Sequence, residues 1–235
     1  MINDEENKKL AGLEMIRTRT GTLSAKNVTL GFDAFIDSVV KVIEHKDSND
    51  TPSYFDSTQA FGEYIVEKGG KSFSIELEAL TTKLGGNMPI MANAVAHMGP
   101  NVSCIGPLGH PDIHPVFRKM PTNCHLHSFA DPGLSKVLEF NSGKIMMAEM
   151  TGLNQIPWDF IKEKVGLNTF IDLFSKSDVI AILNWSELDN STAIWKGLLK
   201  DVLQKSASSK KPMDFLTSQT VRNEETLLYT NQWSC

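Results

Sequence analysis

Two aspartates, Asp33 and Asp37, lie four positions apart just after Gly31. An ionised carboxylate accepts two directed hydrogen bonds. Carboxylates at the interruption between two predicted strands could therefore bind the vicinal hydroxyls of a sugar. Short acidic side chains also cap helices and close turns. We expect at least one of the two aspartates to contact a ligand, with capping as the alternative.

A second candidate site is Gly85-Gly86-Asn87, which precedes an Ala- and Met-rich segment ending at Gly99. The two glycines would let the backbone approach a ligand closely, and Asn87 offers both donors and an acceptor. Asn87 is also a plausible cap for the helix, whose first N–H groups could face an oxygen-rich ligand. A tight turn with a capped helix is the equally weighted alternative. No GxGxxG sequence occurs, which disfavours a dinucleotide site.

Asn184 is a third candidate, near the carboxyl end of the apolar run at 178–185. Open α/β sheets bind ligands at the carboxyl ends of their strands. Asn184 could therefore contact a ligand, although a structural turn is the more common use of such a residue.

A histidine-rich segment could hold a metal ion. It contains His110, His114, Cys124, His125 and His127. The first two histidines have the i, i+4 spacing of ligands on one helical face, but prolines in the same segment interrupt any regular helix. We expect a polar loop here and no metal site. A metal-dependent hydrolase that uses these histidines is the least favoured of the functions considered.

The elements that would carry these residues alternate between strand and helix. Strands are predicted within 28–43 (two, with a break), at 72–79, at 101–106, within 136–150 (two, with a turn) and at 178–185. Helices are predicted at 5–19, 58–67, about 89–99, 158–165, 168–175 and 190–204. This alternation predicts an α/β fold with a mainly parallel sheet.

Composition excludes several classes of protein. The chain has 235 residues and a net charge of −5, which gives no broad attraction for nucleic acid or an anionic membrane. Three cysteines without a CxxC spacing predict neither a disulfide framework nor a four-cysteine zinc site, and favour a reducing cytoplasm. We expect no signal peptide and no membrane span, because the N-terminus is polar and no long apolar run occurs.

Gly85-Gly86 followed by Ala92, Gly99 and Gly109 resembles the first signature of the PfkB (ribokinase-like) carbohydrate kinase family. The segment from Leu30 to Asp37 is similar to the family's opening strand, in which an Asp shortly after a Gly contacts sugar hydroxyls. The family's offset from the glycine falls between the two aspartates, and we rank Asp33 slightly above Asp37. The resemblance covers residues 27–204.

The resemblance implies a ribokinase-like, mainly parallel sheet flanked by helices, with a small β lid. We expect lid segments at about 38–44, 72–80 and 136–150 within a core of residues 1–206. It also implies ATP and Mg²⁺ as cofactors, a sugar or nucleoside as partner, and a possible homodimer through the lid. The substrate-binding residues implied are Asp33, Asp37, Gly85, Gly86, Asn87 and Asn184.

Two departures from the family pattern shape the functional prediction. Ile90 stands where the family usually has an Asn, which leaves that sugar contact unfilled or moved to Asn87. None of the 16 glycines is followed by Asp, so the family's Gly-x-Gly-Asp loop, with its anion hole and general base, is missing. No catalytic residue is therefore assigned.

The sequence thus predicts a sugar kinase truncated before its catalytic loop and inactive as written, with an incomplete C-terminal part. A non-catalytic or vestigial sugar-binding protein is the alternative. Residues 207–235 are predicted to be a linker and an aperiodic tail that leaves one edge of the sheet exposed.

Overall fold

The computed structural model describes residues 10, 12, 14, 21–184 and 188–205, together with the backbone of residues 213–216. The main sheet has five parallel strands in the order β10-β9-β1-β5-β6. Their bounds are β1 Asn27–Gly31, β5 Asn101–Gly106, β6 Cys124–Ser128, β9 Val179–Ile182 and β10 Met213–Leu216.

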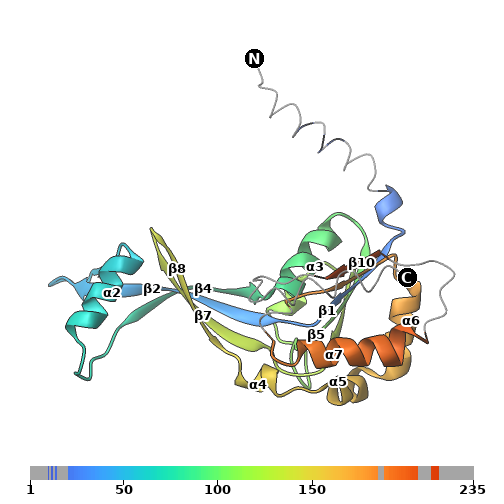
Figure 1. Cartoon of the computed structure of the whole chain (residues 1–235). Helices are drawn as coiled ribbons and strands as arrows, with labels where there is room; N and C mark the ends of the chain where they lie inside the picture. The colour runs from blue at the N-terminus through green and yellow to red at the C-terminus, as the bar shows by residue number, and fades with distance from the viewer. Residues whose placement is uncertain are drawn as a thin grey trace.

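Helices cover both faces of this sheet, which we call the core sheet (Figure 1). One face packs on α3 (Asn87–His97) through an apolar cluster that includes Met88, Ala92 and Leu30. The other packs on α5 (Trp158–Val165), α6 (Leu167–Lys176) and α7 (Ser191–Leu198). Burial on both faces is why β9 is an uninterrupted apolar run. Three short helices complete this part: α4 Thr151–Asn154, the 3₁₀ helix Phe117–Lys119 and the π-helix Leu199–Leu203.

A second sheet extends away from the core and forms the lid (Figure 1). Its strands are β2 Phe35–Lys46, β3 Pro52–Tyr54, β4 Leu77–Gly85, β7 Gly133–Phe140 and β8 Gly143–Glu149. The long strand β2 lies between antiparallel β4 and parallel β7, and β8 pairs antiparallel with β7. The predicted α/β fold with a parallel sheet flanked by helices and a small β lid is confirmed.

The far end of the lid carries helix α2 (Thr58–Glu67) and a small apolar cluster of its own. Ser57 caps α2 by accepting a hydrogen bond from the backbone N–H of Ala60. The rings of Phe55 and Phe61 make an edge-to-face contact inside this cluster, with centroids 5.3 Å apart. The lid tip is therefore held by its own aromatic packing at a distance from the core.

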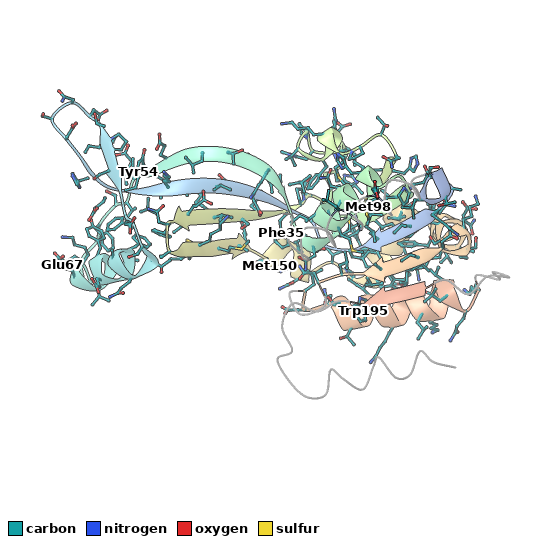
Figure 2. The ribbon with its side chains drawn as sticks, turned by 90° about the horizontal axis from the view of Figure 1, so that it is seen from above. Phe35, Tyr54, Glu67, Met98, Met150 and Trp195 are labelled. Carbon is teal, nitrogen blue, oxygen red and sulfur yellow. The ribbon has the colours of Figure 1, made fainter. Side chains whose placement is uncertain are left out.

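A third apolar cluster joins the lid to the core. Phe35 at the start of β2 packs with Leu153 and Leu188, and Met150 lies against them. Figure 2 labels Phe35 and Met150 at the point where the lid strands meet the core. The start of β2 and the segment that follows β8 are thus held together beside the core sheet.

The sequence-based strand at 72–79, and with it the lid segment at 72–80, is misplaced. The observed strand begins at Leu77 and continues to Gly85. The alternation that suggested strand from residue 72 has another cause: Phe73 contacts the ring of Tyr64 and Ile75 packs against the lid-tip cluster.

The segment predicted to be a linker and an aperiodic tail contains one strand of four residues, β10. Strand β10 pairs with β9 in register, with Met213 opposite Val179 and Leu216 opposite Ile182. The edge of β9 is therefore covered. Four residues are too few to show a periodicity, which is why the pattern missed them.

The predicted helix at 5–19 lies outside the described residues, apart from residues 10, 12 and 14, which are helical. The rest of the predicted tail also lies outside them. Within the described part of the chain, no helix is both long enough and apolar enough to cross a membrane.

Candidate functional site

The site forms where β1, the loop after it, and the start of α3 meet. Asp33 Oδ2 accepts a hydrogen bond from the backbone N–H of Asn87 at 2.6 Å, and Oδ1 accepts from that of Met88 at 2.9 Å. The N-cap position of α3 is Gly86, which has no side chain to offer. The expectation that Asn87 caps the helix is therefore wrong: Asp33 supplies the cap from another segment.

Asn184 joins the same network from the end of β9. Its side-chain amide donates to Asp33 Oδ2 at 3.0 Å, and its oxygen accepts from Asn87 Nδ2 at 3.2 Å. Asn184 is 4% exposed and has a φ of 61°, a left-handed conformation that Asn tolerates better than most residues. Three of the predicted site residues are thus linked directly.

Burial is the dominant influence on the ionisation of Asp33. The side chain is 0% exposed, and burial raises the pKa of Asp33, while its hydrogen bonds with Met88, Asn87 and Asn184 act in the opposite direction. The positive end of the α3 dipole also favours a negative charge at this point. Asp33 therefore stabilises the loop from inside and has no surface open to a ligand.

Each of the two glycines lies against one of the two aspartates. A Cβ at Gly86 would lie 2.8 Å from Asp33 Oδ2 and 3.0 Å from the Cα of Ala34, and the φ of Gly86 is +87°. A Cβ at Gly85 would overlap the carboxyl group of Asp37. The glycine pair is therefore required by close approach to both aspartates, and it brings Asp37 to the same loop as Asp33.

Asp37 lies on the lid, on strand β2. It pairs with Lys83 of β4 on one side and with Ser135 of β7 on the other. Its exposure of 9% contrasts with the complete burial of Asp33. Of the two aspartates, Asp37 is thus the less enclosed.

Burial also raises the pKa of Asp37 above its ordinary value of 3.8. The positive charge of Lys83 opposes this effect most strongly, and Lys144 does so to a smaller extent. The site therefore combines a partly desolvated carboxyl with a nearby ammonium group that favours its charged form.

The histidine-rich segment does not converge on a metal site. Among the described residues, no three His, Cys, Asp or Glu side chains are placed to hold a metal ion together. His110 donates its backbone N–H to Asp131 at 3.0 Å, and His114 donates its own to Leu108 O at 2.8 Å, so both belong to a structured loop.

Sequence reasoning missed Lys83 and Ser135. Strand β7 buries Gly133, Ser135 and Val137 in alternation, so a polar residue at an inward position was a signal that could have been read. Their approach to Asp37 depends on strand pairing across the lid, for which the local sequence holds no signal.

Comparison with known proteins identifies the family. The family model for prokaryotic ketohexokinase matches residues 5–213, which include the whole of this site. The chain belongs to the prokaryotic ketohexokinase family. The resemblance to PfkB carbohydrate kinases inferred from the glycine pair and the opening strand is thereby confirmed.

A similar curated protein is a ketohexokinase from Haloferax volcanii. It is 27% identical over 177 residues, which is 74% of this chain and 47% of that protein. The chain therefore spans about half the length of the curated ketohexokinase that it matches.

Solved structures of carbohydrate kinases also align with the chain. A carbohydrate kinase from Agrobacterium tumefaciens aligns with a TM-score of 0.48 and 15% identity, over 75% of this chain and 51% of that one. A ribokinase from Giardia lamblia aligns with a TM-score of 0.48 and 14% identity, over 86% and 52%. Because both scores are below 0.5, the family assignment rests on the ketohexokinase family model.

Proposed function

We propose that this chain forms the sugar-binding part of an ATP-dependent ketohexokinase-type enzyme, and that its acceptor is a ketohexose such as fructose. The observation that carries the proposal is the Asp37 carboxyl, held against Gly85 on the lid where β2 leaves the core. Membership of the prokaryotic ketohexokinase family and the name of the Haloferax volcanii relative support the choice of acceptor.

The chemistry of the site suits neutral hydroxyl groups. An ionised carboxylate accepts hydrogen bonds from two hydroxyls at once, and Asp37 is the less buried of the two carboxylates of the site. The first N–H groups of α3 that the sequence offered to a ligand, those of Asn87 and Met88, are taken by Asp33. The Asp37 carboxylate would therefore repel an anionic ligand, and these two helix N–H groups would not be free to offset the repulsion. A sugar hydroxyl would instead donate a hydrogen bond to the carboxylate.

The residues present do not fit the nucleotide half of a kinase site. A Mg²⁺–ATP complex needs ligands and an anion hole beside a general base. None of the 16 glycines precedes an Asp, so the residues present supply neither a Gly-x-Gly-Asp anion hole nor its general base. We therefore derive no phosphoryl-transfer step here and propose that the chain as written binds sugar without turning over ATP.

This leaves a second candidate, a non-catalytic sugar-binding protein, which the missing Gly-Asp loop favours for the chain as written. Both candidates have the same sugar site. They differ in whether the nucleotide half of the kinase site is supplied from outside this chain. A nucleoside acceptor is a further outcome that the test below distinguishes.

The test combines binding with turnover. The purified 235-residue chain is titrated by calorimetry with ketohexoses, aldoses and nucleosides, and ADP formation is followed in a coupled assay with the same panel. We expect a ketohexose to bind and ADP to stay at background. Sugar-dependent ADP formation would contradict the inactive assignment. Saturable binding of nucleosides alone would contradict the choice of acceptor.

A further inference from the structure

Ser135 is a buried polar residue to which no role has yet been assigned. It is 4% exposed and lies on β7 between the equally inward Gly133 and Val137. In the parallel pairing of β2 with β7, Ser135 is directly opposite Asp37. Paired residues of neighbouring strands project from the same face of a sheet, so the Ser135 hydroxyl is aimed at the face that carries the Asp37 carboxyl.

The hydroxyl of Ser135 has no hydrogen-bond partner within the described part of the chain. The group it approaches is the Asp37 carboxyl, whose pKa the Ser135 hydroxyl lowers as a hydrogen-bond donor against the effect of burial. The contact does not have the geometry of a fully formed hydrogen bond, so the hydroxyl is not satisfied by it. A buried hydroxyl without a partner is costly, and natural proteins rarely keep one without a reason.

The neighbours of Ser135 explain why the protein leaves this hydroxyl unpaired. On its other side, β8 places Ala148 opposite it, which has only a methyl group. One row nearer the core, β2 places Phe35 between Gly85 and Gly133. On this face, the strands directly beside Ser135 therefore present only one hydrogen-bonding side chain at its level, that of Asp37.

We infer that Ser135 and Asp37 together bind one hydroxyl of the sugar acceptor. The sugar hydroxyl donates its proton to the Asp37 carboxylate and accepts a hydrogen bond from the Ser135 hydroxyl. A hydroxyl is suited to this position because it can donate and accept at once. Ser135 thereby becomes a specificity-determining residue that selects a hydroxyl over hydrogen at one sugar carbon. This inference rests on the proposed function, because it requires that the chain bind a sugar.

The experiment compares wild type and Ser135→Ala by calorimetric titration with fructose and a set of its deoxy analogues. Loss of one net hydrogen bond should weaken fructose binding about 3- to 10-fold. The analogue that lacks the bridged hydroxyl should bind wild type and variant equally, whereas the other analogues should keep the difference. Lys136→Ala is the matched control. Lys136 is the next residue of β7, is exposed and projects from the opposite face, so the variant should bind fructose as tightly as wild type does.

A second measurement tests the inference without sugar. If the Ser135 hydroxyl has no partner in the free protein, Ser135→Ala should unfold at the same or a higher urea concentration than wild type. A clearly lower midpoint would show that the hydroxyl already bonds within the protein and would overturn the inference. Equal fructose binding by wild type and Ser135→Ala would overturn the inference alone, whereas no sugar binding by wild type would refute the proposed function and the inference with it.

Discussion

Asp33 and Asp37 are four positions apart, yet they have different roles in the structure. Asp33 is enclosed and accepts hydrogen bonds from Asn87, Met88 and Asn184. Asp37 lies on the lid next to Lys83. The sequence indicated that a carboxylate was needed here and offered capping as the alternative to ligand contact. It could not divide the two roles between the residues, because that division depends on which strand each one enters.

At the residue scale, we expect Asp33→Asn to lower the free energy of unfolding by about 1–3 kcal/mol. The side-chain NH₂ of Asn would replace one carboxylate oxygen, so one of the N–H groups that now donate to Asp33 would face another donor. Urea unfolding followed by circular dichroism measures the change. Asp112→Asn is the control: Asp112 is exposed, and its substitution should stay within about 0.5 kcal/mol of wild type. Equal stability of the two variants would contradict the capping role of Asp33.

A second residue-scale prediction concerns pH. The ionised carboxylate of Asp37 accepts stronger hydrogen bonds from sugar hydroxyls than the protonated carboxyl does, so sugar affinity should fall as pH falls. Because burial raises the pKa of Asp37, the midpoint of this loss should lie above the ordinary value of 3.8. Lys83→Gln removes the charge that opposes this shift and should move the loss to higher pH.

Calorimetric titration across a pH series measures this dependence for wild type, Lys83→Gln and Asp37→Asn. In Asp37→Asn the affinity should be weak and insensitive to pH over the same range. An unchanged midpoint in Lys83→Gln would show that Lys83 does not act on the carboxyl that binds the sugar.

At the scale of elements, the Gly85-Gly86 loop connects lid strand β4 to core helix α3. Its close approach to Asp33 and Asp37 explains the glycine pair better than turn formation alone does. The loop is therefore the shared support of the cap and of the candidate ligand contact.

We expect Gly86→Ala to destabilise the protein by about 1–3 kcal/mol, because its φ of +87° strains any other residue and its Cβ would press on the Asp33 carboxyl. Thermal and urea unfolding measure the effect. Gly62→Ala is the matched control in the middle of α2, where a Cβ meets nothing within 4 Å. That substitution should instead stabilise by about 0.5–1 kcal/mol. The account would be wrong if Gly86→Ala were as well tolerated as Gly62→Ala.

Local patterns predicted many of these elements well. Helix α2 has the bounds expected from its start and from the glycines after it, and β5 matches its expected range. Both elements are fixed by residues within or next to them. The errors arose where contacts with distant segments determine the structure. Phe73 and Ile75 are apolar because they pack at the lid tip, and not because they lie in a strand. The segment β10 is a strand because it pairs with β9.

The candidate site shows the same limit more sharply. The glycine pair, the two aspartates and Asn184 could be found because each stands beside a break in a local pattern. Ser135 comes to face Asp37 only through the parallel pairing of β2 with β7, two strands about a hundred residues apart along the chain. No property of either segment alone specifies that register.

At the scale of the whole molecule, the lid projects from the core as a thin sheet (Figure 1). Its strands carry exposed large apolar side chains: Leu134 is 54% exposed and Met147 is 59% exposed, and both project from one face of the β7–β8 pair. An exposed apolar face of this kind suits the pairing of two copies through their lids, which the family resemblance implied as a possibility.

We predict that the chain is a dimer in light scattering and that Leu134→Lys shifts it to a monomer. Met98→Lys is the control: Met98 is 39% exposed on the core, at a distance from the lid (Figure 2), and its substitution should leave the dimer intact. A monomeric wild type at high micromolar concentration, or a dimer that survives Leu134→Lys, would exclude pairing through this face.

The most direct test of the central claim is calorimetric titration of the 235-residue chain with fructose, with Asp37→Asn measured in parallel. Hydrogen bonds to a charged group contribute about 1.5–3 kcal/mol, so we predict saturable binding by wild type and affinity about 10- to 100-fold weaker in Asp37→Asn, with unfolding unchanged. Absence of binding by wild type, or equal affinity of the two proteins, would contradict the assignment of a sugar site at Asp37.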